Sequence, residues 1–363
     1  MEEQNMKKIA ILLVLALVVT LFAGCAGDIV IVGDCTCPTG SHTNNPTTPK
    51  PTTPKPTQPP VDGALKTGLA VVTSIAKSEN AKVADYDVTL VAVLVDDNGV
   101  IQDCIIDSVG AKVEFDATGT ITSDINAEVK TKNELGDDYG MVAWGGAIAE
   151  WYKQADALAQ FAIGKTVTEL KEGAIDETGK APAGSDLASS ATIYLGSYVS
   201  AIEVAVNNAK HLGAQGGDEL RLAAIPGLSS SVSATAEKAG TAQLDCDVTA
   251  LTVKDGVITS CYIDSLQAKV SFGTDGVITT DLTAPVQTKN ELGEKYGMVA
   301  WGGAIAEWNV QAASFASYVT GKTAAQVAGI AVNEGTKPTD ADLATSVTIA
   351  IGGFQALIAK ALA

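Results

Sequence analysis

Apolar and polar residues alternate along four short segments in the first half of the chain, the pattern of strands that bury one face. These segments are 86–95, 100–106, 111–115 and 120–125. Asn98-Gly99 lies between the first two and Thr118-Gly119 between the last two, and such pairs favour tight turns. Asp255-Gly256 and Asp275-Gly276 recur in the second half. The pattern therefore predicts two β-hairpins in each half.

Helical spacing follows the strands. Apolar residues at 147, 148, 151, 155, 158 and 162 lie on one face of a helix that Gly164 would end. Thr166 with Glu169, and Thr323 with Gln326, have the spacing of capping boxes that open a second helix. A last helix is predicted after residues 186–192, and its counterpart after 342–348. Strands followed by helices predict an α+β fold of two tandem duplicated domains, each with antiparallel hairpins and then helices.

One stretch of the sequence occurs twice. Residues 131–151 recur as residues 288–308, and only Asp137 and Asp138 are changed, to Glu294 and Lys295. The flanking strands share a pattern but few letters, so something beyond packing holds this stretch. Two alternatives stay open: identity left by a recent duplication, and a Gly/Trp-rich turn into a helix that is fixed for structural reasons.

The beginning of the chain resembles a bacterial lipoprotein signal. Two lysines precede an apolar run at 9–22, and Ala23-Gly24-Cys25 follows. This predicts a signal peptide at 1–24 and lipid attachment at Cys25, on the outer face of the cell membrane. Residues 25–62 form a Thr/Pro-rich spacer, which in polyproline II conformation reaches on the order of 100 Å, enough for a Gram-positive cell wall. Two domains are predicted after it, at 63–213 and 218–363.

Composition excludes several classes of function. The net charge of −18 argues against nucleic acid, whose phosphates require clustered Lys and Arg. The only histidines are His42 and His211, so a triad with a histidine base in each domain is excluded. No phosphate-binding Gly-rich loop occurs. Glu134 with Asp137 offers acid–base chemistry, but Lys295 disturbs this carboxylate group in the second copy. If both domains are active, the reactive group is borrowed from a cofactor.

Cysteines give little more. Five remain after Cys25, an odd number, and Cys246 and Cys261 lie on opposite arms of a predicted hairpin where they can pair. Cys35 and Cys37 with His42 do not have zinc-site spacing, so no metal site is predicted.

A second duplicated motif offers a place for a cofactor. Asp186-Leu-Ala-Ser-Ser-Ala-Thr192 matches Asp342-Leu-Ala-Thr-Ser-Val-Thr348. A helix N-terminus at each site would accommodate a phosphate, and the last Thr can carry a phosphoester. The alternative is ordinary helix capping by these hydroxyl residues. The motif residues besides the two terminal Asp and Thr pairs are Ser189, Ser190, Thr345 and Ser346.

The motif resembles Asp-x-x-Ser-Gly-Ala-Thr of FMN-binding domains in the Rnf and Nqr redox pumps, where the last Thr is esterified to flavin mononucleotide. Lipobox, Thr/Pro spacer and two domains with Lys-x-Glu-Leu-Gly-x-x-Tyr-Gly-Met together resemble the flavinylated lipoproteins of extracellular electron transfer, the PplA type. The resemblance implies covalent FMN on Thr192 and Thr348, installed from FAD by a flavin transferase of the ApbE type. Ser190 and Ser346 depart from the Gly of the pump motif, and Val347 departs from its Ala.

The resemblance gives the repeated stretch a role. Thioether and indole groups make favourable contacts with π surfaces, so the methionines and tryptophans of the stretch are expected to pack against the flavin ring. The two lysines are expected to supply positive charge. The alternative for the tryptophans is a place in the core. The residues concerned are Met141, Met298, Trp144, Trp301, Lys132 and Lys289.

The function implied is an electron carrier, not an enzyme that turns over one substrate. It would receive electrons from a membrane quinol-linked donor and pass them to extracellular acceptors such as ferric iron or free flavins. Two alternatives stay open: a non-redox surface module for adhesion or ligand binding, and a domain that binds FMN without a covalent bond.

Overall fold

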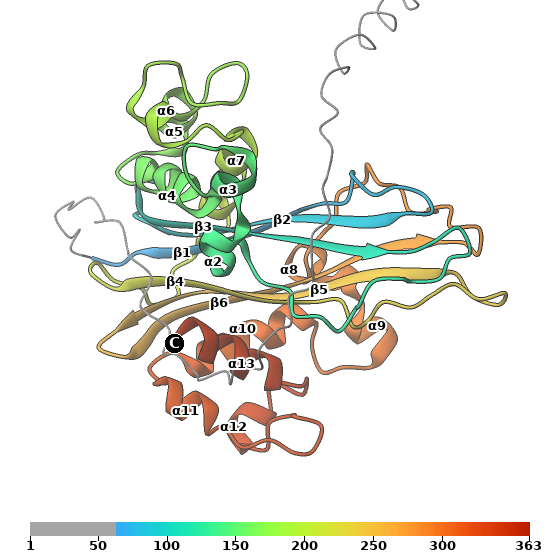
Figure 1. Cartoon of the computed structure of the whole chain (residues 1–363). Coiled ribbons are helices and arrows are strands. Elements are labelled where there is room, and N and C mark those ends of the chain that lie inside the picture. Colours follow the sequence, from blue (N-terminus) through green and yellow to red (C-terminus); the bar gives the residue numbers. More distant parts are fainter. Residues whose placement is uncertain (1–62) are drawn as a thin grey trace, which may run out of the picture. The chain divides into compact units, whose positions relative to one another are not determined.

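The computed structural model describes residues 63–363. The predicted signal peptide at 1–24, the lipid-attachment residue Cys25 and the spacer at 25–62 lie outside the described residues. The described part is a mixed α+β fold with two three-stranded antiparallel sheets (Figure 1). Within residues 63–363, no helix is both long and apolar enough to cross a bilayer.

Each sheet is a meander of consecutive strands. The first sheet consists of β1 (Lys66–Ser74), β2 (Val83–Val95) and β3 (Ile101–Glu114), and the second of β4 (Glu219–Gly227), β5 (Gly240–Lys254) and β6 (Val257–Phe272). The predicted hairpin at Asn98-Gly99 is confirmed as the turn between β2 and β3, where Gly99 has a φ of 80°. The edge strands β1 and β4 were not predicted. The predicted boundary between the domains falls in the connection from 208 to 218, just before β4.

The turn of the second predicted hairpin is confirmed in both halves, but its second arm is only one bridge long. The segment 111–115 is the continuation of β3, and Phe115 bridges Ile121, with Asp116 N donating to Thr120 O at 3.0 Å and Thr122 N donating to Glu114 O at 2.9 Å. The matching bridge of the second half joins Phe272 and Ile278. Beyond that bridge the turn bonds to the other half of the chain. Ile121 donates its N–H to Ser233 Oγ at 3.0 Å, and Gly119 O accepts from Ala234 N at 2.8 Å.

The reverse exchange occurs at the matching turn of the second half. Ile278 N donates to Asn80 Oδ1 at 2.8 Å, and Gly276 O accepts from Ala81 N at 2.8 Å. A Cβ on Gly119 or on Gly276 would overlap backbone of the opposite half, and both have a φ of 68°, so glycine is required at each turn.

Helices follow each sheet in the same order. After β3 come α2 (Lys132–Leu135), the 3-10 helix η1 (Gly136–Tyr139), α3 (Met141–Gly145), α4 (Trp151–Ala162), α5 (Val167–Ala174), α6 (Asp186–Ser190) and α7 (Gly196–Asn207). After β6 come α8 (Lys289–Leu292), η2 (Gly293–Tyr296), α9 (Met298–Gly302), α10 (Trp308–Val319), α11 (Ala324–Ala328), α12 (Ala341–Ala344) and α13 (Gly352–Ala361). The capping boxes of Thr166 and Thr323 are both confirmed.

The helix predicted from residue 147 begins later. Gly146 adopts a left-handed conformation with a φ of 61° and ends α3. Glu150 is extended and precedes the first helical residue, Trp151. Residues 147–149 therefore connect two helices, although their spacing continues the apolar pattern of α4.

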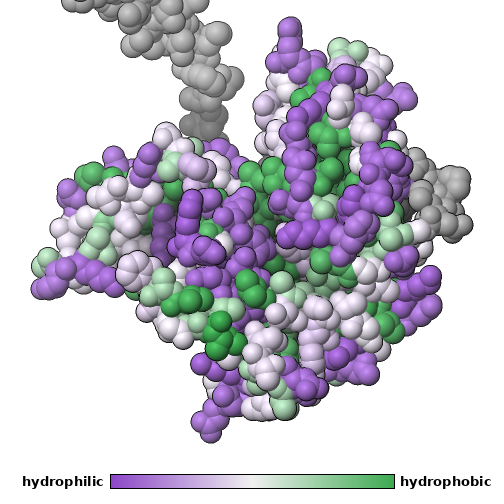
Figure 2. Space-filling model, turned by 180° about the vertical axis from the view of Figure 1, so that it is seen from behind, coloured by the Kyte–Doolittle hydropathy of each residue, from purple (hydrophilic) through white to green (hydrophobic). Residues whose placement is uncertain are grey.

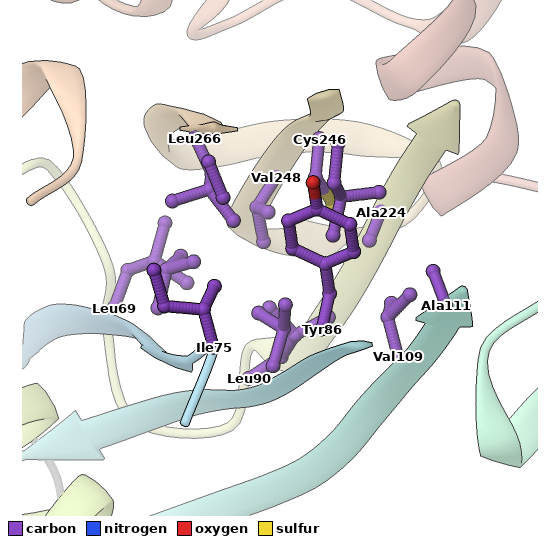
Figure 3. Close-up of a cluster of buried hydrophobic side chains, with 14 of the residues drawn as sticks. Leu69, Ile75, Tyr86, Leu90, Val109, Ala111, Ala224, Cys246, Val248 and Leu266 are labelled. Carbon is purple, nitrogen blue, oxygen red and sulfur yellow. The ribbon is translucent and has the colours of Figure 1, made fainter. Parts of the chain in front are cut away.

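The strands bury both faces, and each face has its own core. One face of each sheet packs against that sheet's helices: Val91, Val93 and Ile106 against α4 and α7, and Leu251 and Ile263 against α10 and α13 (Figure 1). The opposite faces of both sheets contribute to one shared hydrophobic cluster. Figure 3 shows side chains of both sheets pointing toward one another, with Tyr86 of β2 reaching toward Cys246 and Ala224 of the second sheet.

Two phenylalanines, one from each half, stack on one another near the exchanged turns. The rings of Phe115 and Phe272 stack with centroids 4.0 Å apart and planes 2° from parallel. Phe115 directly follows β3 and Phe272 is the last residue of β6, so each ring precedes an exchanged turn, and both are buried. The stack therefore joins the two halves at the point where their turns cross over.

The predicted pairing of Cys246 with Cys261 is wrong. Both thiols are free and buried, and so is Cys104. In the register of β5 with β6, Cys246 lies opposite Leu266 and Cys261 lies opposite Leu251. The two cysteines are on the same hairpin but at different distances from its turn, where Lys254 pairs with Val257, so they do not face one another.

Candidate functional site

The first part of the repeated stretch forms a helix start that docks on a strand. Thr131 and Glu134 form a capping box around α2. Asn133 donates its backbone N–H to Asp107 Oδ1 at 3.0 Å and its side-chain amide to Ile106 O at 3.0 Å. The second half repeats each of these bonds with Thr288, Glu291, Asn290, Asp264 and Ile263. The identity of this part therefore has a structural reason.

Asp107 and Asp264 are the buried anchors of these helix starts. Burial raises the pKa of each carboxyl to about 6, although hydrogen bonds from the docked helix start and from the next backbone N–H oppose the rise. For Asp107 the shortest of these comes from Ser108 N at 2.7 Å. A carboxylate that accepts several N–H groups is the acceptor that a helix N-terminus requires.

The next part of the stretch places a tryptophan in solvent. Trp144 is 90 % exposed and Trp301 is 89 % exposed, so the alternative that these tryptophans belong to the core is wrong. Gly140 lies directly against the Trp144 indole, and a Cβ at this position would overlap the ring. Gly140 also has a φ of 78°, which starts α3 at the required angle. Gly297 and Trp301 have the same arrangement.

Further apolar residues of the stretch are exposed beside each tryptophan in the sequence. They are Val142 and Ile148 in the first copy, and Val299 and Ile305 in the second. Figure 2 shows that apolar residues gather in a few places on an otherwise largely polar face. Met141 and Met298 instead lie partly buried against the core. Because exposed apolar groups do not stabilise the fold, packing does not explain why these positions are identical.

A buried glutamate holds α3 against α4. Glu150 is only 4 % exposed, and its carboxylate accepts the N–H of Met141 at 2.8 Å and that of Val142 at 2.9 Å. Glu307 makes the same two bonds to Met298 and Val299. The N-terminal N–H groups of α3 and α9 are thus occupied by the protein's own carboxylates.

A buried glutamine holds the motif threonine. Gln154 Oε1 accepts from Thr192 N at 2.8 Å, from Thr192 Oγ1 at 3.3 Å and from Ile193 N at 3.2 Å, and Gln154 Nε2 donates to Ala149 O at 2.7 Å. Thr192 itself is exposed, so its hydroxyl is oriented yet accessible. In the second half Gln311 makes the same bonds to Thr348, Ile349 and Ala306, and Thr348 is half-buried.

The predicted helix N-terminus at the motif is wrong. Asp186 begins the short helix α6, which ends at Ser190, and Thr192 follows its C-terminal end. The next helix, α7, begins only at Gly196. The alternative of helix capping by the motif hydroxyls is also wrong, because Ser185 caps α6 and Asp340 caps α12.

The remaining motif residues bond locally. Ser189 Oγ donates to Asp186 O at 2.6 Å, and Thr345 Oγ1 donates to Asp342 O at 2.8 Å. Ser346 Oγ donates to Leu343 O at 3.3 Å. The hydroxyl of Ser190 lies 3.5 Å from that of Ser189.

The first turn of α4 is where these groups meet. Glu150, directly before the helix, bonds α3, and Gln154, in the first turn, bonds Thr192. Lys132 Nζ lies 5.0 Å from the ring of Trp151 and 5.3 Å from that of Tyr139. The side chain of the N-cap residue, Glu150, makes no hydrogen bond to this helix, because its carboxylate is used by α3.

The first turn of α10 has the same arrangement. Lys289 Nζ lies 4.9 Å from the Trp308 ring, and α10 also begins without a side-chain cap. Burial lowers the pKa of Lys289, while Asp247 and Asp245 raise it. In both halves the structure brings together Lys, Met, the motif Thr and the uncapped helix start. It does not bring the remaining motif hydroxyls to that helix start by any hydrogen bond within residues 63–363.

Gln154 and Gln311 were missed by the sequence reasoning. Each lies three residues after the repeated stretch, in a helix where every other shared feature was apolar. The signal was available, since a Gln on the buried face of a predicted helix requires partners for its amide.

A metal site and a histidine at the motif were also considered. Among residues 63–363, no group of three or more His, Cys, Asp and Glu side chains is placed to hold a metal ion. His211 Nε2 lies 3.0 Å from Asp97 Oδ1, on an exposed pair away from the motif. Comparison with protein-family models, curated proteins and solved structures gave no match.

Proposed function

We propose that this chain is an extracellular electron-carrying lipoprotein with two tandem duplicated domains, each holding FMN through a phosphoester to the motif threonine, Thr192 or Thr348. The observation that carries the proposal is that an accessible threonine hydroxyl, fixed by a buried glutamine, recurs in both halves. In both halves it is linked through one helix turn to an identical, solvent-exposed tryptophan segment.

The threonine environment fits attachment of a phosphate. The Thr192 hydroxyl is exposed, and its backbone is fixed by Gln154, so the oxygen is presented with little freedom. Transfer from FAD is balanced if the threonine oxygen loses its proton, forms the new phosphoester bond, and AMP leaves. A flavin transferase of the ApbE type would supply the base.

The helix starts fit the negative charge of that phosphate. The side chains of the N-cap residues Glu150 and Glu307 do not cap α4 and α10, and a helix N-terminus favours an anion. Lys132 and Lys289 place a positive charge at the first residue of these helices. The sequence had placed the phosphate at a helix that starts at the motif itself; the proposal places it at the starts of α4 and α10 instead.

The tryptophan segments fit a planar aromatic group. Trp144 and Trp301 each have one face against glycine and the rest in solvent, so each offers a π surface at little cost in reorganisation. FMN, when bound, supplies one- and two-electron redox chemistry, which no side chain in this arrangement provides. The role proposed for the tryptophan segment is to cover the flavin and to shield it from water.

The rest of the proposal follows from the resemblance and the beginning of the chain. A lipid on Cys25 and the Thr/Pro spacer would anchor the protein on the outer face of a Gram-positive membrane. Electrons would arrive from a membrane quinol-linked donor and leave to ferric iron or free flavins. The second candidate, a non-redox surface binding module, is favoured by the exposed apolar residues alone, since such patches also mark binding sites.

The experiment is an intact mass and a visible spectrum of the full chain, co-expressed with a flavin transferase and analysed after denaturation. Two FMN increments are expected, one lost with Thr192→Ala and the other with Thr348→Ala. A flavin that is released on denaturation would show non-covalent binding. A colourless, unmodified chain would refute the carrier and favour the surface module.

A further inference from the structure

A cavity of about 1180 Å³ lies between the segment that follows α7 and the outer side of β6 with helix α10. Asn207, Lys210 and His211 line it on one side, and Tyr262, Asn290 and Asn309 line it on the other. Binding sites for small molecules are typically about 300–1,000 Å³, so this cavity has room for a ligand of that size with its water. Through Asn309 and Val310 it borders the first turn of α10, which the proposed function also uses.

The cavity follows from differences between the two halves. Asn309 and Val310 on α10 stand where α4 has the larger Tyr152 and Lys153, each one and two residues after the shared tryptophan. In the first half, Tyr152 Oη donates to Asp137 Oδ1 at 3.1 Å, and Lys153 Nζ lies 3.4 Å from the same oxygen.

This difference also explains one of the two changes in the repeated stretch. Glu294 stands at the position of Asp137, and the residues that bond Asp137 are replaced by Asn309 and Val310, which cannot make those bonds in the same way. The difference at 137/294 thus accompanies the difference at the start of the helix that faces it, whereas Trp144 and Trp301 are the same in both halves.

The asparagines on the walls offer acceptor oxygens, which require N–H or O–H donors. The Oδ1 atom of Asn309 is buried and has no hydrogen-bond partner. Asn208 and Asn290, which also line the cavity, each donate their amide nitrogen to a backbone carbonyl, Leu69 O at 3.1 Å and Ile263 O at 2.9 Å, so the acceptor oxygens of their side chains are not used in these bonds. A buried acceptor without a partner costs about 1–3 kcal/mol, which a bound donor would offset.

The charges on the walls oppose one another. Lys210 and His211 on one side face Asp264 and Glu291 on the other. The Lys210 ammonium is also engaged over the Tyr262 ring, 5.0 Å from its centroid. The cavity therefore has no net attraction for an anion such as a free phosphate. Apolar residues complete the walls, namely Val71, Leu212, Ala313 and Ala316.

We infer that this cavity binds an uncharged planar nitrogen heterocycle with N–H edges, of the size of a purine or an isoalloxazine. Apolar walls cover the faces of such a ring, and the asparagine oxygens accept from its edge. Ser346, two residues before Thr348, also lines the cavity. A role for the bound ring as an electron acceptor rests on the proposed function, whereas its binding does not.

The test uses the full chain with Thr192→Ala and Thr348→Ala, which cannot be flavinylated at either threonine. Binding of riboflavin and of adenosine is measured by equilibrium dialysis. The cavity is then filled with the residues of the other half, Asn309→Tyr and Val310→Lys. The control makes the reverse exchange on α4, Tyr152→Asn and Lys153→Val. Because each pair is already accepted at the equivalent place in this fold, both variants are expected to remain folded.

At least one of the two probes is expected to bind the parent, and filling the cavity is expected to weaken that binding about tenfold or more, a loss of about 1.4 kcal/mol or more. The control is expected to bind as the parent does. The inference is overturned if neither probe binds up to its solubility limit, or if the filled variant binds as tightly as the parent. The parent carries no covalent flavin, so these results are independent of the mass measurement that tests the proposed function.

Discussion

Replacing Gln154 with methionine tests the group on which the threonine site depends. Gln154 is fully buried, and its side chain satisfies Thr192 N, Ile193 N and Ala149 O, besides the Thr192 hydroxyl. Methionine is close to glutamine in length and keeps the packing, but it provides neither the acceptor nor the donor. Three backbone groups therefore lose their partner.

The magnitude follows from those three groups. A backbone group that loses its hydrogen bond costs on the order of 1 kcal/mol when water reaches it in part, so the total is about 3 kcal/mol. The exposed Thr192 hydroxyl can bond water and adds little. With about 2.1 cal/mol/K of unfolding entropy per residue, this corresponds to a fall of about 5 °C in Tm for a fold of this size.

The assay combines thermal unfolding with site-resolved mass spectrometry after co-expression with a flavin transferase. Peptides that contain Thr192 are expected to lose most of their FMN, because the threonine is no longer held in place. Peptides that contain Thr348 serve as the internal control, and Gln311→Met is expected to reverse the pattern. Undiminished modification at Thr192 together with an unchanged Tm would refute this reasoning.

Three further predictions concern the fold around the site. Burial raises the pKa of Asp107 from 3.8 to about 6, so the protonated acid stabilises the fold below pH 4 and this contribution is lost as pH rises through 6. The stability of Asp107→Asn relative to the parent should therefore rise by about 3 kcal/mol at most between pH 4 and pH 7 in urea titrations, with Asp264→Asn alike; a pH-independent difference would contradict this. Phe115→Ala removes half of the stack with Phe272 and should cost about 3–5 kcal/mol of unfolding free energy, and a loss below 1 kcal/mol would show that the stack is not part of the core. Trp144→Ala should change stability by less than about 0.5 kcal/mol because the indole is 90 % exposed, yet shift the absorption spectrum of a flavin on Thr192; an unchanged spectrum would exclude the indole from the flavin site.

Local patterns predicted the elements that depend on neighbouring residues. The Asn98-Gly99 turn, the capping box at Thr166 and the strands on either side of the turn were all readable, because turn and cap chemistry act over a few residues. The segment at 120–125 was misread for the opposite reason. Its alternation is that of a strand, but it pairs with β3 only around the Phe115–Ile121 bridge, and Ile121 N donates to Ser233, more than a hundred residues away.

The site was predictable in its residues and not in its geometry. The repetition of Thr192 and Trp144 in equivalent places was visible in the sequence. The helix start beside the threonine was not, since α4 reaches the motif only through the side chain of Gln154. A bond between residues 38 positions apart has no local signature. The exposure of Trp144 could not be predicted either, because it depends on the contact between the indole and Gly140.

The exchanged turns carry a consequence for how this chain can be divided. Asn80 accepts the backbone N–H of residue 278, and Ser233 accepts that of residue 121, so each half satisfies a backbone group of the other. A cut in the connection between 213 and 218 should therefore give two fragments that recover their structure only as a pair. Such a chain behaves as a split protein, in which neither half keeps its turns without the other.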